Sequence, residues 1–514
     1  MALTIDEIAA FCKRKGIVYP NSEIYGGLAG FFDYGPFGAD IKKNIKDEWW
    51  KTFVQSRDDI AGIDGSIITH PKVWEASGHV SCFADIMVTC SNLKCRHKVR
   101  ADQFIEENLD FPADGMKAET INATFSENNL VCPKCKSKFL PAKDFNLMFA
   151  TQVGPEEDKE NIAYLRPETA QVIFADFKLV VENARLKLPF GIAQMGRAFR
   201  NEISPRGFLF RCREFEQMEI EYFIHPEKSD ECPFIDEVLD HEIQYLDADS
   251  QEKGKAETRK ASMKELLEKK IILTKWHAYW LAAVHKWFIK LGAKPDNFRI
   301  RQHVSTEKSH YALDTWDLDY NFPFGWKELV GIANRTDFDL KQHIEHSGQD
   351  LSLYDEESKR KIVPHVVAEP SLGVDRSFLV FLIDSFDDDK ERGNIVLHLD
   401  PGIAPVKAGI FPLVNKLNDD AREIYDMIKE DMPVQYDRSG SVGRRYARAD
   451  EIGIPYCITI DFETREDKSV TIRDRDTTKQ VRIRIDDLKS TLHKLLRKEI
   501  EFEKAGKLIQ AGKD

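Results

Sequence analysis

Residues 199–223, FRNEISPRGFLFRCREFEQMEIEYF, combine arginines, glutamates and phenylalanines at spacings that suit nucleotide chemistry. A proline and a glycine interrupt the middle and both flanks alternate, which predicts two strands joined by a loop. Arg200 ends the first predicted strand and Arg211 begins the second, so an antiparallel hairpin brings their guanidinium groups near each other. Arginine offers bidentate, permanently charged contacts to phosphates, and Phe215 offers a flat face to a purine.

The second strand of this hairpin places acid on a face that a sheet would bury. Alternation separates two sets of side chains, with Phe215, Gln217, Glu219, Glu221 and Phe223 on one face and Glu216, Met218, Ile220 and Tyr222 on the other. Burying a carboxylate costs free energy unless it has partners. We therefore expect these carboxylates to orient the arginines or to accept hydrogen bonds from an adenine amine or a substrate ammonium.

A helix that must support the hairpin is predicted over residues 38–57, after the turn signal DYGPFG. Apolar residues recur there at every fourth position, at Ile41, Ile45, Trp49 and Phe53, which predicts one helical stripe. The stripe either packs on the core of its own chain or forms a subunit interface. The second interpretation predicts a homodimer with this stripe on the two-fold axis.

The rest of the chain divides into a long first part and a shorter second part. Further helices are predicted at 168–184 and over WHAYWLAAVHKWFIKLG, which Gly292 ends. The charged range 235–270 predicts an exposed helical arm or simply a solvated face. A linker at 399–413 leads into a unit with a helix at 417–431, strands near 455–460 and 480–485, and a C-terminal helix. The expected domains are therefore 1–400, with insertions at about 90–140 and about 230–300 (helical), and 401–514.

The composition of all 514 residues is that of a globular protein of two or three domains. No run of about 18 apolar residues occurs and the N-terminus does not resemble a signal peptide, so we expect no membrane partner. Nine cysteines, an odd number, favour reduced thiols and a cytoplasmic location. The net charge of −13 means that local patches must bind any polyanion, and residues 405–514 are nearly balanced, with 22 Lys and Arg against 21 Asp and Glu.

Four cysteines have the spacing of a metal site. Cys90 and Cys95 form a C-x4-C pair, and Cys132 and Cys135 form a C-x2-C pair downstream. Two such pairs predict a structural, tetrahedral Zn²⁺ site, with His97 as a competing ligand. The alternative is a set of plain reduced thiols, as expected for the other cysteines.

The hairpin resembles the second signature motif of class II aminoacyl-tRNA synthetases, which runs Phe-Arg-x-Glu, a loop, and then Arg-x3-Phe-x3-Glu. The segment EPSLGVDRSFLVFL at 369–382 resembles their third motif, although Leu372 and Asp375 replace the usual glycine and glutamate. The helix at 38–57 with its Gly-Pro start resembles the first motif, the dimer element of the class.

The sequences of five segments are similar to those of the homodimeric glycyl-tRNA synthetases. The resemblance extends from about residue 5 to about residue 500. The segments, in family order, are RPETAQ (166–171), FRNEISPRG, REFEQMEIEYF, WKELVGIANRTDFDLKQH (326–343) and EPSLGVDR. The resemblance implies a catalytic domain with an antiparallel sheet flanked by helices and a C-terminal α/β anticodon-binding domain. It also implies that glycine and ATP form glycyl-adenylate and pyrophosphate, and that glycine then passes to the 3′ end of tRNA(Gly).

The same resemblance implies roles for particular residues. Arg200 would contact the α-phosphate, Phe215 would stack on adenine, and Arg376 would cover the other side of the base. Glu202 would face the adenine amine, and Glu328 would bind Mg²⁺. The catalytic set is Arg200, Arg376 and Glu328, and the ATP-binding set is Arg200, Asn201, Glu202, Phe210, Arg211, Phe215, Glu328, Leu329, Gly373, Asp375 and Arg376.

Glycine has no side chain to recognise, so its site must bind the ammonium and carboxylate and leave no room for a β-carbon. The resemblance places Glu168, Glu219 and Glu369 around the ammonium, with Ser371 nearby and Arg100 on the carboxylate side. The full glycine-binding set is Arg100, Glu168, Phe215, Gln217, Glu219, Glu369 and Ser371. Excluding a larger side chain by wall contact requires no editing domain.

Two rival functions remain to be weighed. A class II synthetase for threonine, proline or serine is disfavoured by EPSLGVDR together with FEQMEIEYF. A noncatalytic relative that only binds nucleic acid should lack the motif arginines, but Arg200, Arg211 and Arg376 are present. In the C-terminal unit, either RNA contact or a solvated surface could explain three clusters, Arg444, Arg445 and Arg448, then Arg473 and Arg475, then Arg482 and Arg484.

Overall fold

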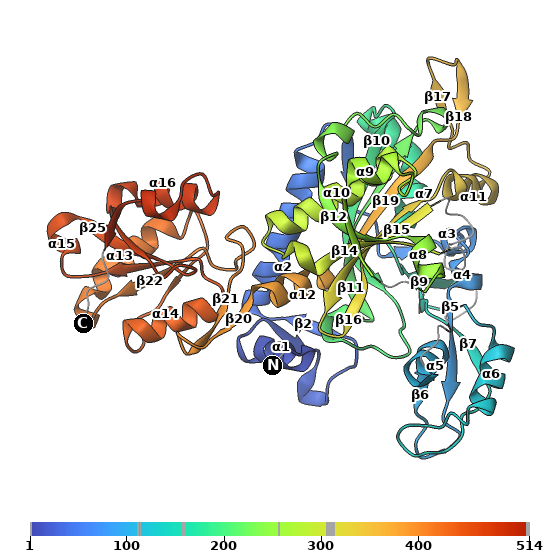
Figure 1. Ribbon diagram of the computed structural model, residues 1–514, viewed down its shortest axis with the longest axis horizontal. Helices are drawn as coiled ribbons and strands as arrows, with labels where there is room; N and C mark the ends of the chain where they lie inside the picture. Colours follow the sequence, from blue (N-terminus) through green and yellow to red (C-terminus); the bar gives the residue numbers. More distant parts are fainter. Residues whose placement is uncertain are drawn as a thin grey trace.

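A computed structural model describes residues 3–109, 113, 115–156, 161–254, 257–304 and 314–509 of the protein. Figure 1 shows a large body around one long sheet, a smaller unit on the left formed by the C-terminal residues, and a blue-to-teal projection at the lower right. Within the described residues, no helix combines the length and the apolar character needed to cross a bilayer.

The large body is organised by a nine-stranded sheet. In spatial order its strands are β13 (Arg259–Ser262), β12 (Glu242–Leu246), β14 (Phe298–Gln302), β15 (Asp314–Phe322), β16 (Gly325–Asn334), β19 (His365–Gly373), β11 (Glu214–Ile224), β10 (Phe190–Phe199) and β3 (Ile60–Ile63). Neighbours run antiparallel except for the pairs β10–β3 and β12–β14. The predicted hairpin is β10 and β11, and β11 lies between β10 and β19, third from the β3 edge of the sheet.

The two faces of β11 pack against different helices, as its alternation predicts. Met218, Ile220 and Tyr222 join the main core, which also contains apolar residues of α2 (Pro36–Trp50), α10 (Lys275–Lys290) and α12 (Val374–Ser385). Phe223, on the opposite face, joins a second core with α7 (Ala170–Ala184). Because Glu219 and Glu221 share the face of Phe223, they lie on the α7 side of the sheet.

The apolar stripe of α2 faces the core of its own chain. Ile41, Ile45 and Trp49 are fully buried, and Phe53 follows them into the same core from a π-helical turn, Lys51–Gln55. The prediction that this stripe forms the two-fold interface is therefore wrong. Large apolar side chains such as these are buried by the nearest apolar surface. Here that surface is the face of β11 that carries Met218, Ile220 and Tyr222, together with α10 and α12.

The range 235–270 does not form a helical arm. It contains β12 and β13, which extend the main sheet, and its described residues also form a 3-10 turn, Ile235–Glu237, and two short α-helices, α8 (Ala248–Glu252) and α9 (Met263–Glu268). Ile243 and Tyr245 point from β12 into the main core. The helix propensity of the charged residues in this range is outweighed by two effects. Alternate side chains of β12 are buried, and its backbone pairs with β14. The helix that Gly292 was predicted to end is observed as α10, and Gly292 has the positive φ of +92° that favours glycine.

The projection at the lower right of Figure 1 carries the four spaced cysteines. It contains a sheet in the order β6 (Lys98–Arg100), β5 (Ala84–Thr89) and β7 (Lys143–Asn146), with α5 (Ala101–Leu109) and α6 (Ala118–Glu127). Val88, Ile105 and Ile121 belong to a core separate from the main one. Beside the projection, β9 (Ile162–Leu165) pairs with β8 (Phe149–Gln152) on one side and with β4 (Ile68–Thr69) on the other, and leads the chain back to α7.

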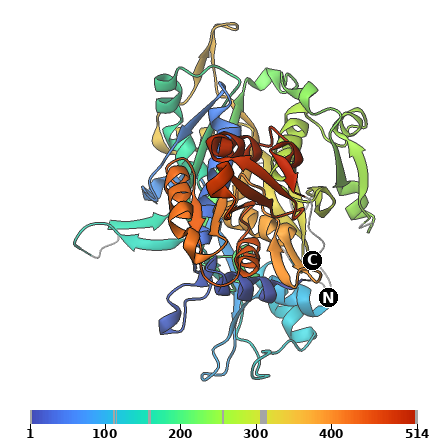
Figure 2. The same cartoon turned by 90° about the vertical axis from the view of Figure 1, so that its left-hand side faces the viewer.

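The C-terminal unit has its own six-stranded sheet and core. The strands in order are β23 (Val434–Tyr436), β22 (Ala408–Pro412), β24 (Tyr456–Ile460), β25 (Ser469–Asp474), β26 (Gln480–Arg484) and β27 (Lys507–Ile509). Helices α13 (Asn418–Ile428) and α16 (Ile485–Leu496) supply apolar residues to this core, and α14 (Val442–Glu451) packs in a separate cluster. Figure 2, which faces this unit, shows it lying over the large body.

Candidate active site

The turn between β10 and β11 holds Arg200 in place from several sides. The Arg200 amide donates a hydrogen bond to the Arg213 carbonyl (2.9 Å), and its Nε donates to the Pro167 carbonyl (3.1 Å). The guanidinium carbon lies 5.3 Å from the centre of the Phe215 ring and 5.5 Å from that of Phe83. These cation–π contacts fix the side chain between two aromatic faces.

Arg211, the second arginine of the hairpin, pairs with Glu202. Its Nε lies 2.8 Å from Glu202 Oε2, and the Glu202 side chain is almost fully buried. The Glu202 carboxylate therefore orients an arginine, which is one of the two roles predicted for the glutamates of residues 199–223.

Arg376 joins α12 to the hairpin and to β16. Its Nε donates to the Phe210 carbonyl (3.1 Å) and one terminal nitrogen donates to the Glu328 carbonyl (2.9 Å). The guanidinium lies 4.5 Å from the centre of the Phe210 ring, and the Glu328 carboxylate is 3.6 Å away. The arginine of the third motif therefore packs on Phe210 and lies beside Glu328.

These side chains enclose a cavity of about 240 Å³. Its lining residues are Arg200, Glu202, Leu209, Phe210, Arg211, Cys212, Phe215, Gln217, Glu328, Ser371, Gly373, Asp375 and Arg376. Most of the predicted ATP-binding set is thus brought together. Leu209 and Cys212 were not predicted, because nothing in their residue type marks them as ligands.

Two members of the predicted ATP set lie outside this lining. The Leu329 side chain is buried in the main core, and Asn201 instead donates its amide to the Leu147 carbonyl (2.8 Å). The pairing of β15 with β16 shifts register at Leu318/Asp319, opposite residues 328–330. This bulge places Leu329 and Val330 both inside the core and leaves Glu328 on the cavity rim. Only backbone atoms of Leu329 could contact a nucleotide.

Asp375 is occupied by contacts on the α2 side of β11. Its Oδ2 accepts a hydrogen bond from the Glu216 amide (2.7 Å), and its Oδ1 accepts from Lys42 Nζ (3.0 Å) and from the Tyr34 hydroxyl. Asp375 borders the cavity, but its carboxylate connects α12 to β11 and α2. These contacts position α12 against β11, and contact of Asp375 with a nucleotide stays a prediction.

The cavity continues toward a set of buried carboxylates through Gln217 and Ser371. Gln217 Nε2 donates to Ser371 Oγ (3.2 Å), and Glu219 lies opposite Ser371 in the β11–β19 register. The Thr169 hydroxyl donates to Glu219 Oε2. Burial, followed by the charge of Glu168, raises the pKa of Glu219.

Glu168 lies just before α7, and of the three predicted ammonium ligands it is the one whose surroundings favour the ionised carboxylate. His79 Nε2 is 3.3 Å from one oxygen, and Gln171 Nε2 donates to the other (3.2 Å). Burial acts to raise its pKa, but His79 and the positive fields of Arg335 and Arg200 hold the pKa of Glu168 well below its ordinary value.

Glu369, the third of these carboxylates, is bound by an arginine that the sequence reasoning missed. One terminal nitrogen of Arg335 contacts both Glu369 oxygens at 3.0 Å, while its other nitrogens donate to Asp339 at 2.7 and 2.8 Å. Burial raises the pKa of Glu369 to about 8, against the lowering effect of Arg335. The spacing of Arg335 and Asp339 by four residues was the available signal.

Arg100 lies in the cysteine-bearing projection and not in the cavity lining. Its Nε and one terminal nitrogen donate to Asp102 at 2.6–2.8 Å, and Asp85 lies 3.3 Å away. The charges of Arg211 and Glu202 also act on the pKa of Asp85, so the base of the projection lies next to the hairpin. The contact of Arg100 with a substrate carboxylate remains a prediction.

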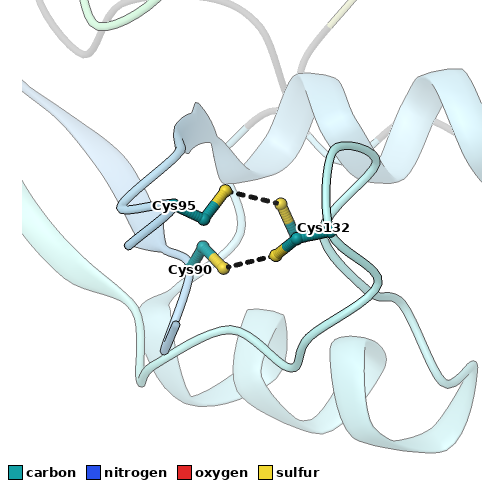
Figure 3. Close-up of side chains that lie close together, drawn as sticks. Cys90, Cys95 and Cys132 are labelled. Carbon is teal, nitrogen blue, oxygen red and sulfur yellow. Dashed lines mark hydrogen bonds between the residues drawn. The ribbon is translucent and has the colours of Figure 1, made fainter. Parts of the chain in front are cut away.

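The four spaced cysteines converge within the projection, and Figure 3 shows three of them, Cys90, Cys95 and Cys132, close together. All four Sγ atoms of Cys90, Cys95, Cys132 and Cys135 lie within 4.8 Å of one another. The Cys90–Cys135 and Cys95–Cys132 sulfur distances are 3.3 and 3.8 Å. Tetrahedral Zn²⁺ with Zn–S bonds of about 2.3 Å requires sulfurs about 3.8 Å apart, so this donor set fits zinc. His97 is not a member of the cluster and contributes its backbone carbonyl to the Cys90 amide instead.

The basic clusters of the C-terminal unit divide into internal and exposed arginines. Four are engaged inside the unit: Arg445 donates to the Pro412 carbonyl, Arg473 to Asp450, Arg475 to the Gly453 and Leu399 carbonyls, and Arg482 to Asp461 and Asp467. These four guanidinium groups are thus engaged with backbone and carboxylate oxygens of the protein, and contact of the clusters with RNA stays a prediction. Arg444, Arg448 and Arg484 are exposed.

Comparison with known proteins is consistent with this geometry. The family described as tRNA synthetase class II core domain (G, H, P, S and T) matches residues 150–240, and the family described as anticodon binding domain matches residues 407–495. A glycine–tRNA ligase of Geobacillus thermodenitrificans is 45% identical over 96% of this chain and 98% of its own. Those of Caldanaerobacter subterraneus subsp. tengcongensis and Clostridium kluyveri are 44% and 43% identical, over 96% and 97% of this chain and 99% of theirs.

Proposed function

The chain belongs to the glycine–tRNA ligase family of class II aminoacyl-tRNA synthetases, and we propose that the cavity and carboxylates described above perform its first step. The protein is a glycine–tRNA ligase with a class II core and an anticodon-binding domain, and glycine, ATP and tRNA are its substrates. In the proposed step the glycine carboxylate attacks the α-phosphorus of ATP, a new P–O bond forms, and pyrophosphate leaves with the electrons of the broken bond.

The observation that carries the assignment is the position of Arg200 and Phe215 between two regions of opposite character. On one side lie Arg211 and Arg376, which suit phosphates, and on the other lie Gln217, Ser371 and the buried glutamates. The reacting carboxylate and the α-phosphate would therefore meet beside Arg200. A positive charge that is already fixed there stabilises the negative charge that grows in the transition state.

The ammonium of glycine would be bound by Glu168, Glu219 and Glu369. Gln217 supports this assignment, because its buried Oε1 has no hydrogen-bond partner within the described part of the chain. The pocket walls come from a sheet and a helix start, so a β-carbon would meet packed side chains. No group needs to remove a proton from the nucleophile, since the glycine carboxylate is already ionised.

ATP would be bound as its Mg²⁺ complex, and Glu328 is the carboxylate that fits the metal. Its side chain is about half exposed at the cavity rim, where phosphates would lie. Magnesium prefers few protein oxygens together with phosphate oxygens and water. When bound, the ion supplies charge that counters the phosphates, while Arg376 covers the nucleotide from the side of Phe210.

A homodimer and a cytoplasmic location complete the proposal. Because the α2 stripe is internal, we place the contact with a second copy on the loop at 21–31. Its Ile24 and Tyr25 side chains are 88% and 87% exposed, more than isolated surface residues of this kind usually are. The Arg213 amide donates to the Gly30 carbonyl (2.7 Å), which connects this loop to the hairpin. Sedimentation at micromolar concentration should show a dimer that Tyr25→Asp weakens.

The reaction itself is tested by pyrophosphate exchange. Purified protein with Mg²⁺ should exchange labelled pyrophosphate into ATP with glycine, and far more slowly with alanine, serine, threonine or proline. If serine, threonine or proline supported exchange better than glycine, the assigned ammonium pocket would be wrong.

A further inference from the structure

Glu221 is a buried carboxyl group for which adenylate formation, as proposed above, has no use. It follows Glu219 by two residues on β11, so both side chains lie on the α7 face of the sheet. Its side chain is fully buried, and neither carboxyl oxygen has a hydrogen-bond partner within the described residues. An ionised carboxylate in such surroundings is costly, and a native protein rarely retains one without a reason.

Two other carboxyl groups lie close to Glu221. Oxygens of Glu219, Glu221 and Glu369 lie within 4.8 Å of one another. Thr169 and Ser371 supply hydrogen bonds to Glu219, and Arg335 supplies them to Glu369. Among the described residues none donates to Glu221, so a proton of its own is the donor that the local geometry allows.

The charges around this cluster do not balance. The groups that face Glu221 from the surrounding elements are Glu219 on β11, Glu369 on β19, Arg335 after β16, Asp339 and His343 on α11, and Glu168 before α7. Arg335 already serves both Glu369 and Asp339. His79 serves Glu168, and His343 Nε2 contacts the Gln171 amide oxygen at 3.0 Å. Without substrate, negative charge therefore exceeds positive charge in this buried region.

We propose that Glu221 and Glu369 hold one proton between them in the free enzyme and that the glycine ammonium displaces it to solvent on binding. The exchange balances in charge, because one ammonium enters as one proton leaves. Ionising both of these close, buried carboxyl groups is unfavourable, because Arg335 is shared with Asp339 and its single charge cannot offset all three carboxylates. Glu221 is thus a positioning residue that keeps the cluster neutral enough to stay folded while the site is empty. This inference rests on the proposed glycine site.

The pKa directions agree with this arrangement. Burial and the neighbouring charge of Glu369 raise the pKa of Glu221 well above its ordinary value, and burial raises the pKa of Glu369 to about 8. At pH 7 the free pair therefore retains its proton. A bound ammonium lowers the pKa of the pair, so glycine should bind more tightly as the pH rises toward 8. Between the lowered and the free pKa, the limiting slope is tenfold in Kd per pH unit.

Titration calorimetry of glycine into the full-length enzyme without ATP tests the proposal. Experiments at pH 7.0 in phosphate and in Tris, whose ionisation enthalpies differ, measure the protons released. The wild type should release close to one proton, and the release should decline as the pH passes 8. Glu221→Gln, which retains shape but cannot ionise, should release none and should show a Kd that does not change between pH 6.5 and 8.

Two further variants separate the possible failures. Glu219→Gln removes a proposed ammonium ligand and should weaken glycine binding by at least tenfold; normal binding by this variant would overturn the glycine site itself. His79→Gln should retain the proton release, because the carboxyl pair and not the imidazole is its source. Glycine binding by the wild type without proton release, or full release by Glu221→Gln, would overturn the shared proton while leaving the site intact.

Discussion

Arg200 is held by two aromatic rings and a backbone carbonyl, so its charge is in place before substrate arrives. Substituting Arg200→Ala should lower kcat for pyrophosphate exchange by about 10²–10³-fold, the usual cost of losing one transition-state donor. KM for ATP should change much less, because the contact strengthens only as charge develops. Arg197→Ala is the matched control, since Arg197 is exposed on β10, the strand that ends just before Arg200, and pairs with Glu214. A nearly normal kcat for Arg200→Ala would show that the residue only supports the fold.

Buried carboxyl groups also give the protein a pH-dependent stability with a definite sign. Glu221 has a raised pKa in the folded protein, so it favours the folded state below its unfolded pKa and disfavours it as the pH rises. Glu221→Gln should therefore raise Tm, with a difference from wild type that grows between pH 5.5 and 8.

Glu216, on the other face of the same strand, provides the opposite case. Burial acts to raise its pKa, but Lys42 and Lys46 lower it overall. Its stabilising contribution is thus present above the unfolded pKa and is lost as the pH falls. Glu216→Gln should lower Tm at pH 7 and converge with wild type toward pH 4 in calorimetric scans. Equal shifts in both variants would contradict the assigned directions.

At the scale of elements, the cysteine-bearing projection has a separate core and a metal-shaped set of four thiols. Protein purified without chelator should contain near one zinc per chain by elemental analysis, and Cys132→Ser with Cys135→Ser should lose it. Because the site joins two loops of the projection, hydrogen exchange in residues 84–146 should rise strongly, while exchange in β10 and β11 should change little.

Cys12→Ser is the control for the zinc measurement, because Cys12 is a buried thiol in the main core. It should retain full zinc content. Absence of metal from freshly prepared wild-type protein would leave the four cysteines as reduced thiols that happen to converge.

At the scale of the whole molecule, the C-terminal unit and the catalytic body can be tested separately by charge. Arg444→Glu with Arg484→Glu alters exposed residues of the anticodon-binding domain and should raise KM for tRNA several-fold, since each phosphate contact also releases counterions. Glycine-dependent pyrophosphate exchange should remain at the wild-type rate, because both residues are remote from the cavity. Equal loss in the two assays would mean that the domains do not divide the work in this way.

A truncated chain would be a poorer test of this division. Lys15 pairs with Glu451 at 2.6 Å, and Asn44 Nδ2 donates to the Ala404 carbonyl at 2.9 Å. Arg392 donates to the Arg475 carbonyl at 2.7 Å. Removing the C-terminal unit would break these contacts and expose the surface of the catalytic body beneath them. A loss of activity could then not be attributed to tRNA binding alone.

Local patterns in the sequence were sufficient to predict the hairpin, the opposite faces of β11, the end of α10 at Gly292 and the convergence of four cysteines. Each depends on periodicity, a special backbone conformation or ligand spacing, all of which act over a few residues. Tertiary packing decided which surfaces those elements met. It placed the α2 stripe inside its own chain, paired the range 235–270 into the main sheet, and buried Arg473 and Arg475 against oxygens of the protein. It also brought Arg335 to Glu369 and left Glu221 without a donor from the part of the chain that the structure describes, because burial and charge pairing depend on residues far apart in the chain.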